Sequence, residues 1–189
     1  MRILIVDDES LIRMDLRDIL ESEQHEVVGE ASNGVEAITM CKELKPDAVL
    51  MDVKMPKLDG IEAARQIGFN HLAPVVLLTS YSQQDLVTKA RESGVYGYLI
   101  KPVREEQLIP TLEMACGRFL DDLESRQQMA DLEKTLEERK IIQKATGILM
   151  ALYKITEDES YNRIRQLSMK KRESIVNICK LIIQQASSN

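Results

Sequence analysis

Five short apolar runs between Ile3 and Ile100, separated by longer amphipathic stretches, constrain the fold of this chain more than any other feature. The runs are Ile3–Val6, Val27–Val28, Ala48–Met51, Val75–Leu78 and Tyr98–Ile100. Strands that alternate with helices build βαβ units, in which consecutive strands lie parallel. The sequence therefore predicts an α/β fold with a five-stranded, doubly wound parallel sheet.

Each amphipathic stretch has apolar residues at the spacing of one helix face. The predicted faces are Leu11, Met14, Ile19 and Leu20; Ala37, Ile38, Cys41 and Leu44; Ile61, Ala64 and Ile67; and Leu86, Val87 and Ala90. One helix is expected from each group.

Chemically useful side chains follow four of the five runs: Asp7 and Asp8, then Asp52, Thr79 and Lys101. Because the carboxyl ends of parallel strands meet at one sheet edge, where ligands bind, we expect these groups to converge. Each residue alone has a structural alternative. An aspartate after a strand often caps the next helix, and a lysine is often a solvated surface residue.

The predicted convergence of three carboxylates indicates a cation. Two carboxylates 4 Å apart repel by about 4 kcal/mol at an effective dielectric near 20, so three stay ionised together only around positive charge. Oxygen ligands with open positions suit Mg²⁺. The site predicts phosphoryl transfer onto Asp52, with Lys101 and Thr79 binding the new phosphate oxygens.

These residues, with Met55-Pro56, Asp59-Gly60, Tyr98 and Pro102, resemble the receiver domain of two-component response regulators over residues 1–120. The resemblance implies a flavodoxin-like fold, a cis Lys101-Pro102 bond and Thr79 with Tyr98 as a switch pair. It also implies Asp52 as the phosphoacceptor and a Mg²⁺ site made by Asp7, Asp8, Asp52 and the backbone carbonyl of Lys54.

Neither His25 nor His71 matches a motif of that family, so the phosphodonor histidine is expected on a separate sensor histidine kinase. The resemblance implies no enzyme activity beyond Mg²⁺-dependent self-phosphotransfer and slow autodephosphorylation. No apolar run approaches the ~20 residues of a membrane span, and the first apolar stretch is too short for a signal peptide and is followed at once by Asp7 and Asp8. We expect a cytoplasmic protein with no membrane partner.

The segment from Gln107 to Met150 is rich in Leu, Glu, Lys, Arg and Gln and predicts one long helix. Two apolar triplets have coiled-coil spacing but are one residue out of frame: Cys116, Phe119 and Leu123, then Met129, Leu132 and Leu136. We expect residues 107–137 to link the domains and to dimerise as an imperfect parallel helix pair. The alternative is a single helix lying on its own domain.

Residues 137–187 predict a small all-α domain of three helices, with Thr156 to Glu159 as the capping box of the second. The predicted core positions are Ile141, Ile142, Ala145, Ile148, Leu149 and Leu152; Tyr161, Ile164 and Leu167; and Ile175, Ile178, Cys179, Ile182 and Ile183. So small a core is expected to gain stability from the preceding helix or a partner chain.

Charge divides the chain into two regions. Residues 137–189 carry ten Lys and Arg against six Asp and Glu, a net charge of +4, whereas residues 1–136 carry −10. A basic cluster at Lys170-Lys171-Arg172 stands out, and Arg163, Arg165 and Lys144 add to it. Such a cluster is often only a solvated face, but in an acidic protein it favours nucleic-acid binding.

The run Ala145-Thr146-Gly147-Ile148-Leu149-Met150, with Tyr161, Arg165, Ser168 and Met169, resembles the ANTAR domain, a three-helix module that binds RNA hairpins and prevents transcription termination. Ser160 departs from the family, which commonly has Ala there. Gly147 costs a helix about 1 kcal/mol against Ala, which predicts close approach of another backbone, protein or RNA. The candidate RNA contacts are Lys144, Ala145, Gly147, Tyr161, Arg165, Ser168, Met169, Lys170, Lys171 and Arg172; the small residues and the tyrosine have helix packing as their alternative role.

The two domains together resemble the ethanolamine-utilisation antiterminators. They predict that phosphorylation of Asp52 promotes dimerisation and binding of paired RNA hairpins in a nascent leader transcript. A DNA-binding response regulator is the main alternative, although the apolar last helix offers few side chains to read bases. A phosphorelay or protein-docking module is a third class, which would leave the basic cluster without a role.

Overall fold

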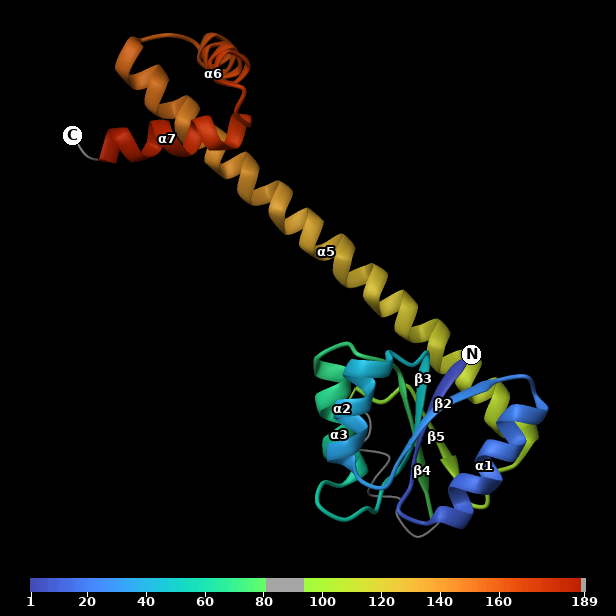
Figure 1. Cartoon of the computed structure of the whole chain (residues 1–189). Helices are drawn as coiled ribbons and strands as arrows, with labels where there is room; N and C mark the ends of the chain where they lie inside the picture. The colour runs from blue at the N-terminus through green and yellow to red at the C-terminus, as the bar shows by residue number, and fades with distance from the viewer. Residues whose placement is uncertain (81–93, 188–189) are drawn as a thin grey trace. The chain divides into compact units, whose positions relative to one another are not determined.

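The computed structural model describes residues 1–80 and 94–187. The chain forms two compact units, Met1–Glu124 and Ser125–Asn189 (Figure 1). The helix predicted at Leu86, Val87 and Ala90 lies outside the described residues.

The first unit contains the predicted five-stranded parallel sheet, with strand order β2-β1-β3-β4-β5. The strands are β1 (Arg2–Val6), β2 (Glu26–Ala31), β3 (Ala48–Asp52), β4 (Val75–Thr79) and β5 (Gly97–Ile100). The predicted fold class is therefore confirmed. All five strands present their carboxyl ends at the same edge.

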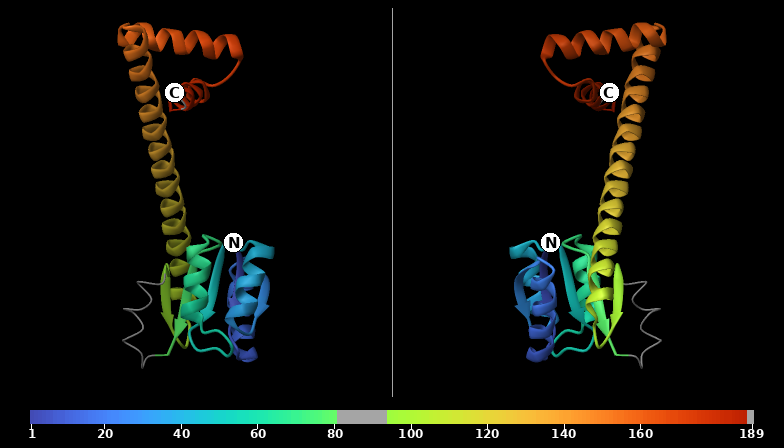
Figure 2. Two further views of the ribbon diagram at one scale, coloured as in Figure 1. Left: turned by 90° about the vertical axis from the view of Figure 1, so that its left-hand side faces the viewer. Right: turned by 90° about the vertical axis from the view of Figure 1, so that its right-hand side faces the viewer.

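Helices cover both faces of this sheet (Figures 1 and 2). The helices α2 (Gly34–Leu44) and α3 (Gly60–Phe69) pack on one face, and α1 (Ser10–Ser22) and the first turns of α5 (Glu105–Tyr153) pack on the other. Alternate residues of each strand enter the two cores, which is why the strands read as unbroken apolar runs.

The predicted apolar face of α1 is partly wrong. Leu16 and Leu20 are buried and Ile19 is partly buried, but Leu11 is 69% exposed and Met14 is also exposed. The sheet covers only one stripe of the helix, and Leu11 and Met14 fall outside it although their spacing fits a helix.

The long helix α5 spans Glu105–Tyr153, with Pro110 inside it. Because proline has no N–H, the Glu106 carbonyl lacks its usual helical donor. Nearby, Leu108 and Leu112 are fully buried against the sheet. This packing holds the first turns of α5 despite the missing hydrogen bond.

The two apolar triplets of α5 have different surroundings. Phe119 is buried, and its ring meets Tyr96 edge-on with centroids 5.3 Å apart. Its neighbour Cys116 packs against the core of the first unit. The prediction that this triplet joins a helix pair is therefore wrong for these two residues. Leu132 is 61% exposed, and Met129 and Leu136 are exposed on either side of it.

The second unit consists of the end of α5 with α6 (Glu157–Lys171) and α7 (Ile175–Ser187). The capping box is present: the Thr156 hydroxyl accepts from the Glu159 N–H, and the Glu159 carboxylate accepts from the Thr156 N–H. The fully or largely buried core residues are Ala145, Leu149, Ile164, Ile178 and Cys179. None of the helices in the described parts of the chain is long and apolar enough to cross a membrane.

Three predicted core positions of this unit are wrong. Tyr161 is 41% exposed, and Leu167 and Leu152 are also exposed. Ser160 occupies the buried position beside Ile164 instead, and its hydroxyl has no hydrogen-bond partner in the described parts of the chain. The helix α6 therefore buries a narrower stripe than its apolar pattern predicts.

Candidate functional site

An ion-pair cluster lies at the carboxyl edge of the sheet. The Lys101 ammonium, just beyond β5, is 2.7 Å from Oδ2 of Asp7 and 2.5 Å from Oδ1 of Asp52. These three side chains come from the ends of β1, β3 and β5, as the sheet topology predicts. Thr79 ends β4 and is partly buried, and its hydroxyl donates to the Ser80 carbonyl over 3.3 Å.

The loop after β3 fixes Asp52. Its Oδ2 accepts a hydrogen bond from the Lys54 N–H at 2.8 Å. A Cβ at Gly60 would lie 2.0 Å from the Asp52 carbonyl oxygen, so only glycine allows α3 to begin so close to the site. Asp59 caps α3 by accepting from the Glu62 N–H.

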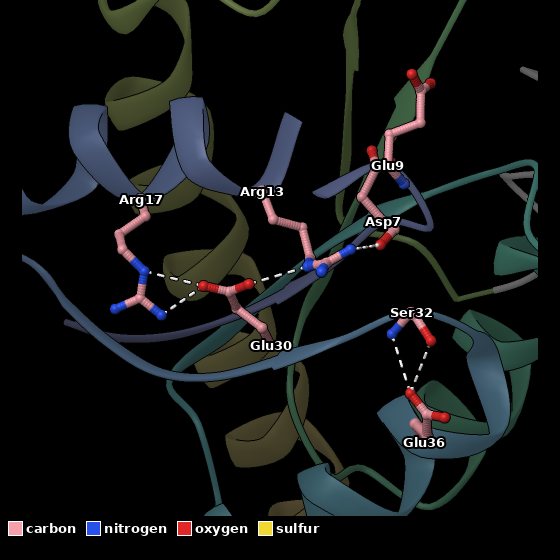
Figure 3. Close-up of polar contacts among 7 residues, drawn as sticks. All are labelled: Asp7, Glu9, Arg13, Arg17, Glu30, Ser32 and Glu36. Carbon is pink, nitrogen blue, oxygen red and sulfur yellow. Dashed lines mark hydrogen bonds and ion pairs between the residues drawn. The ribbon is translucent and has the colours of Figure 1, made fainter. Parts of the chain in front are cut away.

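A charged network contacts the backbone of Asp7 (Figure 3). The Arg13 guanidinium donates to the Asp7 carbonyl oxygen at 2.7 Å and to Glu30 at 2.9 Å. Arg17 contacts the other Glu30 oxygen at 2.5 Å. The N–H of Glu9 donates to Asp7 Oδ1. The sequence did not predict this network, because Arg13 and Glu30 belong to different elements.

Two carboxylates share one ammonium, so the cluster keeps an excess negative charge. Burial raises the pKa of Asp52 above its usual value, and the nearby Asp7 carboxylate raises it further, against the lowering effect of Lys101. Burial alone would lower the pKa of Lys101, but its hydrogen bonds to Asp52 and Asp7 outweigh burial and raise it. The cluster is therefore suited to an additional cation.

The oxygen donors of this cluster fit Mg²⁺, which prefers carboxylate and carbonyl ligands. Asp7 and Asp52 lie together, whereas Asp8 is exposed. Within the described ranges, no three His, Cys, Asp or Glu side chains are arranged as a ready metal site. A Mg²⁺ site would therefore require Asp8 to turn inward and Lys101 to release at least one carboxylate.

Thr79 and Tyr98, the pair predicted to act as a switch, lie on β4 and β5 close in sequence to Ser80 and Lys101. Tyr98 on β5 is 49% exposed. The Lys101 N–H donates to the Thr79 carbonyl, and the Lys101-Pro102 bond is cis, as the resemblance implied.

The candidate RNA residues of α5 separate into different environments. Ala145 is fully buried in the small core and offers no surface to RNA, so its proposed contact is wrong. Gly147 is exposed, and nothing lies within 4 Å of a Cβ built there. No described backbone of this chain therefore approaches Gly147. The prediction that a backbone of the protein itself packs closely against this glycine is wrong within one chain.

Lys144 lines a pocket of about 360 Å³ with Lys140 of the same helix and Lys180 of α7. Lys140 and Lys180 were not among the residues predicted from the sequence to contact RNA. Lys140 could have been found from its spacing, because residues four apart lie on the same face of a helix and Lys144 was already a candidate.

The candidates on α6 lie mostly at its surface. Tyr161, Arg165 and Met169 are exposed, as are Lys170 and Lys171. The hydroxyl of Ser168 donates to the Glu173 carbonyl at 2.5 Å, and Arg172 adopts a left-handed conformation as the helix ends. Ser168 therefore has a structural role at this helix end.

A buried aspartate pair bridged by lysine at the carboxyl edge of a five-stranded parallel sheet defines the first unit as a receiver domain. The chain belongs to the response regulator family, because residues 3–113 match the response regulator receiver domain; residues 130–183 match the ANTAR domain. It is 41% identical to the transcriptional regulatory protein PdtaR of Mycobacterium tuberculosis over 97% of this chain and 89% of PdtaR.

Solved receiver structures are similar to the first unit. The response regulator domain of Thermotoga maritima CheB matches with a TM-score of 0.58 and 32% identity, over 62% of this chain and 96% of that one. The receiver domain of a Pseudomonas aeruginosa sensor histidine kinase, which has a magnesium ion in its active-site cleft, matches with a TM-score of 0.55 and 28% identity. That match covers 61% of this chain and 97% of the solved one.

Proposed function

We propose that this response regulator is an RNA-binding antiterminator controlled by phosphorylation of Asp52. Phosphorylation by a partner sensor histidine kinase promotes dimerisation, and the dimer binds hairpins in a nascent leader transcript. The observation that carries the proposal is Lys101 bound to both Asp7 and Asp52, in a chain whose other unit is an ANTAR domain.

In the phosphotransfer step an Asp52 carboxylate oxygen attacks the phosphorus of the kinase phosphohistidine. A P–O bond forms, the P–N bond breaks, and its electron pair returns to the imidazole. Asp7, Asp8, Asp52 and the Lys54 carbonyl would hold Mg²⁺, which would supply charge stabilisation to the transferred group. Lys101 then pairs with a phosphoryl oxygen instead of a carboxylate.

The exposed apolar residues of α1 support kinase docking next to the acceptor. Leu11 and Met14 lie on a helix that starts at Ser10, three residues after Asp7. Apolar side chains grouped beside a charged site favour a protein contact there.

The switch uses Thr79 and Tyr98. The phosphoryl group adds roughly −1.5 to −2 charge, by analogy with phosphorylated hydroxyls, and draws the Thr79 hydroxyl toward it. The space that Thr79 leaves admits the Tyr98 ring, which is half exposed before phosphorylation. This rearrangement changes the surface next to α5 and so favours pairing of two chains.

Pairing through α5 uses the stripe of Met129, Leu132 and Leu136, which has coiled-coil spacing and is exposed in the single chain. Leu132→Lys should keep the phosphorylated chain monomeric in sedimentation. Leu120→Lys is the matched control, because Leu120 is exposed on a different face of α5. Equal dimerisation of both variants would exclude this stripe as the interface.

Labelling with acetyl phosphate and Mg²⁺ tests the acceptor. Asp52→Asn should abolish labelling, because the amide oxygen is too weak a nucleophile to form the acyl phosphate. Asp59→Asn should label normally, since Asp59 only caps α3 and asparagine caps equally well. Labelling that persists in Asp52→Asn places the acceptor elsewhere.

The DNA-binding alternative has less support from α7. Ile178 and Cys179 of that helix are buried in the small core, and Ile175, Ile182 and Ile183 pack against it. A recognition helix needs polar side chains that are free to reach bases, and Asn177, one of the exposed polar residues of α7, already donates to the Glu173 carboxylate.

A further inference from the structure

A pocket of about 400 Å³ opens between the end of α5 and the outer surface of α6. Its lining residues are Leu149, Tyr153, Arg163, Gln166, Leu167 and Lys170. The volume lies within the roughly 300–1,000 Å³ range of small-ligand sites. All of the lining belongs to the second unit.

The floor of the pocket is apolar, and one side of it is formed by an aromatic ring with a guanidinium group stacked on it. Leu149 is nearly buried, and the Arg163 guanidinium carbon lies 5.1 Å from the centroid of the Tyr153 ring. Tyr153 is 59% exposed, so its ring remains accessible beside the arginine. A flat ligand can stack on such a surface, because both groups present planar faces.

Among the described residues that line the pocket, two are cations and none is a carboxylate. Lys170 and Arg163 therefore favour a ligand that carries negative charge. Gln166 supplies an amide that both donates and accepts, which suits the edge of a base. A planar heterocycle joined to a phosphate can stack on the aromatic ring, hydrogen-bond to the amide and pair with a cation.

This pocket lies on a different side of α6 from the residues that resemble the ANTAR pattern. At 100° per residue, Arg163, Gln166 and Lys170 share one flank, whereas Tyr161, Arg165 and Ser168 share the opposite one. The buried stripe of Ser160 and Ile164 separates the two flanks. The two flanks can therefore be tested independently by substitution.

We propose that this pocket binds one unpaired nucleobase of an RNA loop, stacked on Tyr153 and Arg163, with Lys170 bound to an adjoining phosphate. The proposal rests on the RNA-binding function proposed above and adds where a base is bound. Unstacked loop bases have exposed faces and edges, which aromatic, arginine and amide side chains recognise.

The test uses the full phosphorylated chain and a pool of stem-loop RNAs that share one stem and have randomised loops. The tightest loop is then measured against Tyr153→Leu and against Tyr161→Leu on the opposite flank. Tyr153→Leu should weaken binding roughly 5- to 150-fold, the effect of losing one stacked base. The loss should occur without a change in salt dependence, whereas Lys170→Gln should lower the salt slope by about 0.7.

An abasic nucleotide at each loop position identifies the stacked base. At one position the abasic RNA should bind Tyr153→Leu and the unaltered chain equally, because neither complex retains the stack. If Tyr153→Leu and Gln166→Ala bind every loop as the unaltered chain does, the pocket proposal fails while hairpin binding stands.

A second experiment tests four free nucleotides as competitors: adenosine, guanosine, cytidine and uridine monophosphate. They should fail to compete with the hairpin at millimolar concentration. If they bind in a Tyr153-dependent manner and no hairpin binds, the pocket holds a free nucleotide, and both the loop-base proposal and the proposed function fail. If the chain binds neither RNA nor nucleotide, both proposals also fail.

Discussion

The receiver site and the ANTAR surface place their functional side chains in opposite environments. Asp7 and Asp52 are buried at strand ends and held by Lys101, by backbone N–H groups and, through the Asp7 carbonyl, by Arg13. The candidate RNA residues of α6 stand mostly on exposed flanks of one helix. A covalent phosphoryl site needs charges fixed before the reaction, whereas RNA contact needs accessible side chains.

The same contrast appears in the two cores. The sheet has a buried layer on each face, so mutations near Asp52 act on tightly packed backbone. The ANTAR core has far fewer fully buried side chains and includes an unpaired hydroxyl. Small substitutions should therefore cost more stability next to Asp52 than at the open or poorly hydrogen-bonded positions of the ANTAR unit.

The largest expected effect comes from paired glycine substitutions. Gly60→Ala should destabilise the receiver by ~3 kcal/mol, because the new methyl group meets the Asp52 carbonyl. Gly147→Ala should stabilise the ANTAR unit by about 1 kcal/mol, because nothing obstructs a Cβ in this helical position.

Native-state hydrogen exchange of the amides in β3 reports the stability of the receiver, and exchange in α6 reports that of the ANTAR unit, so both effects can be measured in the full chain. A Gly60→Ala receiver as stable as the original would refute the close contact at Asp52. If Gly147→Ala stabilises the unit but weakens hairpin binding, RNA is the backbone that approaches this glycine.

Paired serine substitutions should have smaller effects. Ser160→Ala should stabilise the ANTAR unit by ~1 kcal/mol, because it removes a buried hydroxyl without a partner. Ser168→Ala should cost about 1 kcal/mol, because it removes the bond to the Glu173 carbonyl. Amide protection in α6 and α7 measures both, and a destabilised Ser160→Ala would show that this hydroxyl has an unrecognised partner.

The smallest effect concerns Glu30, whose pKa is lowered chiefly by the Arg17 hydrogen bond and further by Arg13. A lowered pKa stabilises the fold above the ordinary value of 4.5, and this contribution is lost as the pH falls through the folded-state pKa. Glu30→Gln should therefore cost under ~1 kcal/mol at neutral pH. The difference from the original chain should shrink below pH 4.5; a difference that is independent of pH would contradict the ion pair.

The difference between the two units also explains which of their features could be predicted from the sequence. Asp52 and Lys101 were predicted to meet because parallel strands bring their carboxyl ends to one edge, whatever the side-chain details. Ala145 and Tyr161 were each predicted both as a core position and as an RNA contact, and the sequence alone could not choose between the two roles, because a small bundle covers only part of each apolar face. The contact of Arg13 with Glu30 joins separate elements, and no local pattern encodes it.

The most direct test measures affinity of the full chain for leader-type RNA hairpins and for duplex DNA, before and after phosphorylation. Phosphorylation should tighten hairpin binding by about 5- to 150-fold, the usual range of coupling between two sites. Asp52→Asn should show no such gain. Hairpin affinity that does not respond to phosphorylation, or a preference for duplex DNA at every salt concentration, would contradict the account.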